Sequence, residues 1–286
     1  MRNTMKVVRW EIKRNLKSKS FLTGLFLTPA MLVLFFLLSS VFNGANEAFM
    51  NGTVAPDILE QFVPGVFAGI ILLSIVYTGM MTFQSASQER KDKMAEIVLS
   101  SVTPGELMQG KIYGYFVLGL IQVFVWITLA IPFIIWKFDM SIFTYLFTFK
   151  TIVFVIFALL GYLLFAALFV GLGATIEDVS AAGSFQGMVL MLPFVPLIFF
   201  RSVLEDPNST VVKAVSYIPF TSPSVMIFRL TILEEWVWME VALSIIILCV
   251  SIWICTKLAG RVFKIGIQKY GKNATPQEIW KWMWLS

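Results

Sequence analysis

Residues 88–111 read QERKDKMAEIVLSSVTPGELMQGK and run directly into the apolar stretch IYGYFVLGLIQVFVWITLAIPFIIW over residues 112–136. About 20 apolar residues are enough to cross the hydrocarbon core of a bilayer as a helix. The second stretch is therefore expected to span a membrane, and the first, named here the charged segment, to lie at the membrane surface. A chain that only had to cross lipid would not need so many charges between two apolar runs.

The whole chain contains six apolar runs of membrane-spanning length. They cover residues 21–42, 65–84, 112–136, 152–176, 179–200 and 238–257. Backbone polar groups inside lipid must be paired within the segment, and no run alternates apolar and polar residues as a barrel strand does. With 58% hydrophobic and only 14% charged residues, the chain is predicted to be an all-α polytopic membrane protein with six transmembrane helices in one domain, residues 1–286.

The distribution of basic residues predicts the orientation. Seventeen of the 22 Lys and Arg residues precede the first run, lie in residues 85–111 or lie from Lys257, the end of the last run, onward. An excess of Lys and Arg marks the cytoplasmic side of a membrane protein. Both termini and the charged segment are therefore expected in the cytoplasm, with a cell membrane, such as a bacterial inner membrane, as the location. The net charge of +5 then favours lipid headgroups over nucleic acid as its partner.

Residues 1–20 have the pattern of an amphipathic helix lying in the membrane interface. Met5, Val8, Ile12 and Leu16 share one face at helical spacing, and basic residues flank them. A plain positively charged flank of the first span is the alternative.

Residues 201–237 are too polar to span the membrane and too apolar for a simple loop. Pro219 and Pro223 are expected to break any helix there. We expect short outer helices before the last span, either re-entrant or on the surface; an ordinary interfacial loop is the alternative. Residues 258–286 are expected to form a basic cytoplasmic tail.

The charged segment divides into a surface helix and a lever. Its first half has an amphipathic stripe, and Glu89 and Lys93 form a favourable i,i+4 pair. Its second half contains the capping-box pattern of Thr103, Pro104 and Glu106, which predicts a helix that continues into the third apolar run. A push on the surface helix would then reach a transmembrane helix without a flexible linker between them. A capped loop lying on the membrane is the alternative.

This segment resembles the cytoplasmic loop of type-two ABC export permeases, especially the sodium-extrusion (Nat-type) membrane subunits. Two further stretches resemble the same family in the same order: PFTSP at residues 219–223 with Met226 and Arg229, and AGRVFKIG at residues 259–266 followed by YGK at 270–272. The resemblance implies that the charged segment contacts a separate ABC ATPase. The residues it assigns to that contact are Glu89, Met94, Glu96, Ile97, Leu99, Ser100, Thr103, Pro104 and Glu106. Those expected in an outer gate or re-entrant segment are Pro219, Phe220, Ser222, Pro223 and Arg229. Many members of this family carry a large outer domain between the first two spans, where this chain has only residues 43–64.

Several groups that chemistry would need are absent from the sequence. The Gly-Lys pairs at residues 110–111 and 271–272 are not followed by Ser or Thr, so no phosphate-binding loop is present. There is no His, and the apolar runs contain almost no ionisable residues. We therefore expect a permease subunit with no catalytic residue, metal or cofactor of its own, with ATP and Mg²⁺ bound by the partner ATPase.

The permease is expected to export a substrate that the sequence does not identify, and to pair with a second copy or a homologous permease. A self-contained carrier or channel, and a non-transport immunity or sensor subunit, are the alternatives. Gln122 and Gln186 are the main polar groups within the runs, and they either bond between helices or contact substrate.

Overall fold

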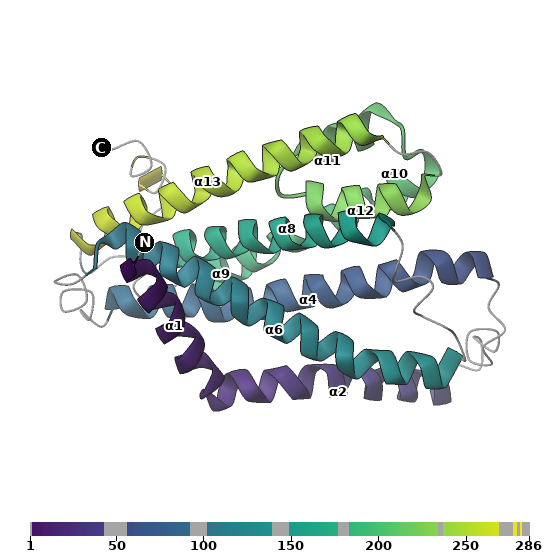
Figure 1. The fold of residues 1–286 in the computed structure, drawn as a ribbon, viewed down its shortest axis with the longest axis horizontal. Helices are drawn as coiled ribbons and strands as arrows, with labels where there is room; N and C mark the ends of the chain where they lie inside the picture. Colours follow the sequence, from purple (N-terminus) through teal and green to yellow (C-terminus); the bar gives the residue numbers. More distant parts are fainter. Residues whose placement is uncertain are drawn as a thin grey trace.

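A computed structural model describes residues 2–42, 56–91, 102–138, 149–176, 183–233 and 237–268, together with 277–278 and 281. Every regular element within these ranges is a helix (Figure 1). The elements are α1 (Arg2–Leu16), α2 (Lys19–Phe42), α4 (Pro56–Lys91), α6 (Pro104–Phe138), α8 (Phe149–Gly173), α9 (Gly183–Leu190), the 3₁₀ helix η2 (Leu192–Phe199), α10 (Phe200–Glu205), α11 (Thr210–Tyr217), α12 (Ser222–Ile232) and α13 (Trp238–Gln268).

The long helices confirm an all-helical membrane protein. Four segments within the described residues are long and apolar enough to cross a bilayer: Gly69–Gln88 in α4, Pro104–Pro132 in α6, Thr151–Gly173 in α8 and Trp238–Gly266 in α13. The first predicted run lies in α2, a helix of 24 residues. In the bundle α8 is central, because it packs against α4, α6, α12 and α13 (Figure 1).

The prediction of one continuous α-helix over residues 179–200 is wrong for the part that the structure describes. From residue 183 onward this run forms the eight-residue α9, a turn at Met191 and the 3₁₀ helix η2. Pro193 and Pro196 lie within η2. Proline has no N–H to donate and its ring clashes with the preceding turn, so an α-helix cannot continue through these two positions without distortion. The tighter 3₁₀ turn is the local solution.

Residues 200–232 fold as three short helices, α10, α11 and α12, as expected for residues 201–237. The predicted break at Pro219 falls in the turn between α11 and α12. The predicted break at Pro223 is wrong, since this proline lies in the first turn of α12. The first turn has no i−4 partner for its N–H groups, so proline is tolerated there.

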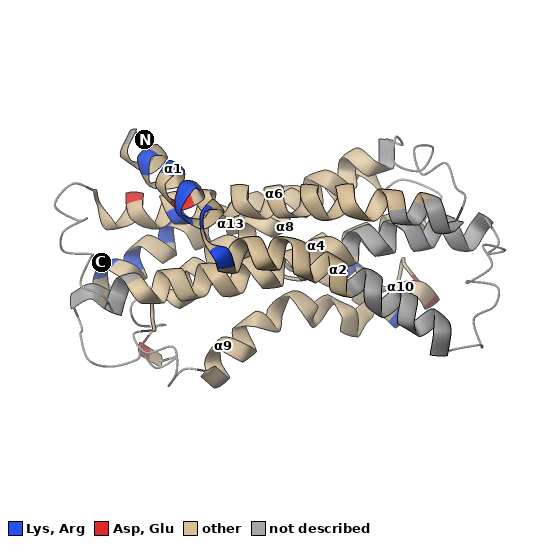
Figure 2. Ribbon diagram, turned by 90° about the horizontal axis from the view of Figure 1, so that it is seen from below, with Lys and Arg blue, Asp and Glu red and all other residues tan. Residues whose placement is uncertain are grey.

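The start of α1 and the end of α13 lie at one end of the bundle, which we name the terminal end (Figure 1). Figure 2 shows that basic residues gather there, on α1 and on the last turns of α13. The start of α6 is also at this end, because it packs against α1. Residue 102, the first described residue after the gap in the charged segment, is thus close to the terminal end.

Candidate functional site

The capping box at the start of α6 forms as the sequence predicts. The Thr103 hydroxyl accepts a hydrogen bond from the Glu106 backbone N–H at 3.3 Å, and the Glu106 carboxylate accepts from the Thr103 N–H and hydroxyl at 3.1 Å each. Pro104 occupies the first helical position. These bonds satisfy backbone donors that a helix start otherwise leaves unpaired, so α6 begins at a defined residue directly after the charged segment.

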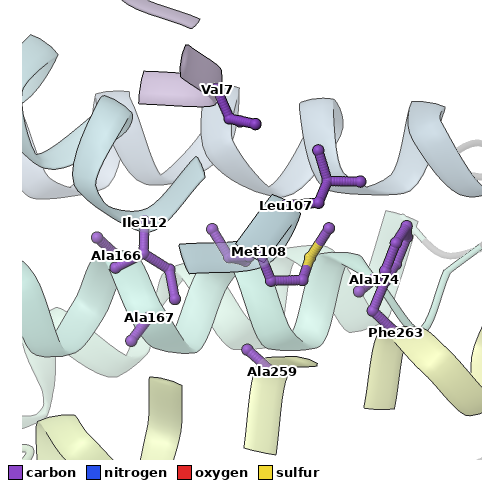
Figure 3. Close-up of a cluster of buried hydrophobic side chains, with 10 residues drawn as sticks. Val7, Leu107, Met108, Ile112, Ala166, Ala167, Ala174, Ala259 and Phe263 are labelled. Carbon is purple, nitrogen blue, oxygen red and sulfur yellow. The ribbon is translucent and has the colours of Figure 1, made fainter. Parts of the chain in front are cut away.

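The first turns of α6 are buried in a tightly packed cluster of apolar side chains (Figure 3). Leu107, Met108 and Ile112 point from α6 into this cluster, and at most 2% of each is exposed. The facing residues are mostly small, which lets the helices approach closely: Ala166, Ala167 and Val170 from α8, Ala174 in the turn after α8, and Ala259 with Phe263 from α13. The base of α6 is therefore held against two other helices, and a displacement of it must move them or break this packing.

Helix α1 packs parallel to the base of α6 through two glycines. A Cβ at Gly110 would lie 2.5 Å from the Val7 side chain, and a Cβ at Gly114 would lie 2.9 Å from Cβ of Glu11. Only glycine permits this approach, in the manner of the small-residue pairs that join transmembrane helices. The expected apolar stripe is only partly the contact face, because Val8 is buried while Met5 and Leu16 are 56% and 37% exposed.

A buried group of charged and polar side chains joins α1, α4 and α6 at this level. Lys111 Nζ lies 2.6 Å from Glu11 Oε1 and donates to the Ser85 hydroxyl at 2.7 Å. Arg14 reaches the other Glu11 oxygen at 2.7 Å and Ser85 at 2.8 Å. The side chains of Glu11 and Lys111 have no exposed surface. We name these four residues the charged cluster.

Further contacts fix the geometry of the charged cluster. Asn15 donates to the Glu11 backbone carbonyl at 2.9 Å and lies within 3.4 Å of the Tyr115 hydroxyl. The Arg14 guanidinium lies 4.2 Å from the centre of the Trp10 ring. A buried ion pair with additional hydrogen bonds is strongly destabilised when one partner is lost, so the cluster ties the three helices into one arrangement.

The charged segment itself lies largely outside the described residues. This applies to Met94, Glu96, Ile97, Leu99 and Ser100, and to the side chain of Glu89 near the end of α4. Thr103, Pro104 and Glu106 are described, and they lie at the point where the segment joins α6. What the segment contacts stays a prediction.

The second predicted site centres on Arg229, which is fully buried on α12. Its guanidinium donates to the Pro207 carbonyl at 2.6 Å and to the Asn208 side chain at 3.0 Å, and it forms an ion pair with Glu240 at the start of α13. Burial, followed by the Glu240 carboxylate, raises the pKa of the nearby Tyr217 phenol, an effect that Arg229 partly offsets. Arg229 therefore fastens α12 to α13 and to the loop before α11.

The other predicted residues of this second site do not converge on Arg229. Ser222 bonds to Ser244 of α13, and Pro223 packs against Gly161 of α8. Pro219 lies in the turn between α11 and α12, and the next residue, Phe220, is 38% exposed. The arrangement is a structural junction of α8, α12 and α13, and it places no set of groups suited to chemistry. Within the described ranges, no three His, Cys, Asp or Glu side chains are grouped so that they would hold a metal ion.

The sequence analysis did not single out Glu11 or Ser85, and it placed Lys111 in the charged segment at the membrane surface. Glu11 and Lys111 lie outside the six apolar runs, and both are wholly buried. The available signal was the Gly110–Gly114 pair, which is typical of a close helix contact and flanks Lys111.

Comparison with known proteins identifies related sequences. A family model described as ABC-2 family transporter protein matches residues 49–261. The uncharacterized protein MJ1024 of Methanocaldococcus jannaschii is 30% identical over 223 residues, which cover 78% of this chain and 54% of that protein. The uncharacterized protein YhaP of Bacillus subtilis is 26% identical over 254 residues, covering 82% of this chain and 58% of that protein. The chain thus spans little more than half the length of these relatives.

Proposed function

We propose that this chain, which belongs to the ABC-2 transporter family, is the membrane subunit of an ATP-binding-cassette exporter. A separate ATPase would bind and hydrolyse Mg-ATP. The coupling role is supported by the way in which the base of α6 starts and is held. It begins at the capped end of the charged segment and is joined to α1 and α4 by the charged cluster.

The proposed topology has six membrane crossings, with both termini and the charged segment in the cytoplasm. Four crossings correspond to the spans in α4, α6, α8 and α13. The remaining two would be α2 and the discontinuous run α9–η2. The gathering of Lys and Arg at the terminal end supports a cytoplasmic position for that end (Figure 2). On this topology α1 would lie at the cytoplasmic interface.

The proposed coupling step is mechanical. The ATPase would bind the charged segment, where Glu89, Met94, Glu96, Ile97, Leu99 and Ser100 are the predicted contacts. Movement of that segment would be transmitted directly to α6 at Thr103, because the capping box fixes where the helix starts. Since α6 is packed closely on α1 and linked to α4 through Ser85, the three helices would move together. Two such subunits, either two copies or one copy with a related permease, would open a path for substrate.

The relatives are themselves uncharacterized, so the substrate and the sodium-extrusion subfamily stay predictions. The chain would work as part of an ATP-driven exporter, in which the movement caused by ATP hydrolysis reaches the membrane at the base of α6.

The test is co-purification of the chain with a candidate ATPase, followed by ATP hydrolysis measured in proteoliposomes. Glu89→Lys and Pro104→Gly are expected to weaken binding or to uncouple hydrolysis from transport. Lys213→Glu changes the charge of a residue on α11, outside the charged segment, and serves as the control. Normal binding and coupling in both segment variants would show that the coupling role is wrong. Transport by the purified chain alone, without ATP, would instead favour a self-contained carrier.

A further inference from the structure

Gln122, at the middle of the span in α6, is a buried polar group without a partner. The side chain has no exposed surface, and neither its Nε2 nor its Oε1 has a hydrogen-bond partner among the described residues. Within that part of the chain, these are the only fully buried side-chain N or O atoms left unpaired. An amide held in an apolar interior without hydrogen bonds is unfavourable, and native proteins rarely retain one without a reason.

A polar stripe runs along the buried face of α4. Ser74, Thr78, Thr82 and Ser85 follow one another at spacings of four, four and three residues, which places them on one face of the helix, and all four are buried. The stripe starts near the middle of the bundle and ends at the charged cluster, of which Ser85 is a member.

Tyr162 of α8 connects this stripe to α6. Its hydroxyl bonds to the Thr78 hydroxyl and lies 3.4 Å from that of Ser74. The same hydroxyl lies against the α6 backbone at Gly119, where a Cβ would come within 1.9 Å of it. Gln122 is one helical turn beyond Gly119 on the same side of α6. The backbone of Gln122 therefore lies one helical turn from the point where Tyr162 meets α6.

The three helices leave a narrow crevice along this row of hydroxyl groups. Its polar lining comes from Thr78, Thr82, Tyr115 and Tyr162. The crevice is too constricted to hold water in this structure. Tyr115 links its lower end to Asn15 and so to the charged cluster, which closes the row at the terminal end.

We propose that α4, α6 and α8 enclose a polar passage within the subunit, that the charged cluster closes it at the terminal end, and that Gln122 lines its inner part. The inference rests on the proposed function, because the movement that opens the passage is the displacement of α6 by the ATPase. When Lys111 moves away from Glu11 and Ser85, water enters between the helices and hydrates the Gln122 amide. The passage accepts neutral hydrogen-bonding groups, since its inner part presents hydroxyls and one amide and no charge.

The competing explanation is that the hydroxyl stripe only packs helices. Thr78 and Thr82 each donate to the backbone carbonyl four residues earlier at 2.6 Å, which satisfies them without any ligand. Packing does not account for Gln122, and it predicts that no residue of the row ever meets water.

The experiment measures the reaction of single cysteines with a small, neutral, water-soluble reagent, 2-hydroxyethyl methanethiosulfonate. Cys249 and Cys255 are first replaced by Ala. Gln122→Cys and Thr82→Cys probe the row from its two sides. Leu164→Cys is the matched control, because this residue of α8 is equally buried but belongs to the cluster facing α12 and α13. Each variant is reconstituted with the ATPase, and labelling is compared with and without Mg-ATP while hydrolysis is recorded in the same vesicles.

We expect labelling at positions 122 and 82 to become roughly tenfold faster or more during ATP hydrolysis, as when a minor open state becomes a major one. Position 164 should stay protected. Unchanged labelling at 122 and 82 while ATP is hydrolysed would overturn the passage and leave the proposed function intact. Equal acceleration at all three positions would also overturn it, since the bundle would then be loosening generally. If no ATPase associates with the chain, the proposed function fails and this inference fails with it.

Discussion

Substitutions in the charged cluster are expected to destabilise the protein unequally. At 2.6 Å the Glu11–Lys111 attraction is about 6 kcal/mol for an effective dielectric constant of 20, most of which offsets the loss of hydration. Glu11→Gln leaves two cations, Lys111 and Arg14, donating to the same Ser85 hydroxyl without the Glu11 carboxylate that both of them contact. The expected cost is about 3–5 kcal/mol, the usual result of removing one partner of a buried ion pair.

Lys111→Met should cost less than Glu11→Gln, near the lower end of the same range. Glu11 then keeps Arg14 and Asn15 as hydrogen-bond donors, so its charge remains compensated. The double variant Glu11→Gln with Lys111→Met should be more stable than Glu11→Gln alone, because Arg14 is then the one cation left in the charged cluster and its side chain is 39% exposed. The two effects are therefore expected to be non-additive, as for groups in direct contact.

Unfolding of the detergent-purified protein, followed by the fluorescence of its nine Trp residues, measures these differences. The exposed Arg201–Glu205 pair is the control, since it has the same chemistry at 2.7 Å but side chains that are 88% and 64% exposed. Glu205→Gln should cost less than about 1 kcal/mol. Equal losses in Glu11→Gln and Glu205→Gln, or strict additivity in the double variant, would refute the account of the cluster.

Three further substitutions test other contacts in the same unfolding assay. Gly114→Leu should cost about 1–3 kcal/mol of stability, because the added side chain forces α1 away from α6. Gly187→Ala, where a Cβ meets nothing within 4 Å, should be neutral or slightly stabilising. Equal effects of the two substitutions would contradict the close contact of α1 with α6. Arg229→Lys should cost about 2–3 kcal/mol because an ammonium cannot reproduce the forked donation to three acceptors, and a neutral result would show that those bonds contribute little. Thr103→Ala should cost about 1 kcal/mol at the helix start while Thr103→Ser should not, and a loss in both variants would point away from the cap.

Local signals in the sequence were sufficient for the helices and for the start of α6. The apolar runs predicted α4, α6, α8 and α13, and the pattern of Thr103, Pro104 and Glu106 predicted a cap that the structure confirms. The interruption at η2 was also encoded locally by Pro193 and Pro196, but hydropathy alone does not distinguish an α-helix from a 3₁₀ segment. Local patterns failed where the determining contact is distant in sequence.

The charged cluster is the clearest example of such a contact. Lys111 follows Glu11 by 100 residues, and each looks like an ordinary surface charge beside its sequence neighbours. Their burial follows from the close approach of α1 at Gly110 and Gly114, which only the packed structure reveals. The same holds for Gln122, because whether a mid-span amide finds a partner depends on how three separate helices are placed.

Stability alone does not explain why an ion pair lies at the base of α6. Replacing a buried pair by apolar side chains is often neutral or stabilising, and apolar residues already make up 58% of this chain. If the ion pair only held the helices together, apolar packing like that around Met108 and Ile112 would serve equally well. An ion pair has two properties that apolar packing lacks. It holds α1, α4 and α6 in one relative position, and once it is separated in a polar environment each of its two charges can be hydrated. A closure that must open and close repeatedly benefits from that property, whereas an apolar plug would resist wetting. The Glu11–Lys111 pair lies between α6, which would receive the work of ATP hydrolysis, and the row of hydroxyls leading to Gln122. This position favours a reversible closure over a permanent support.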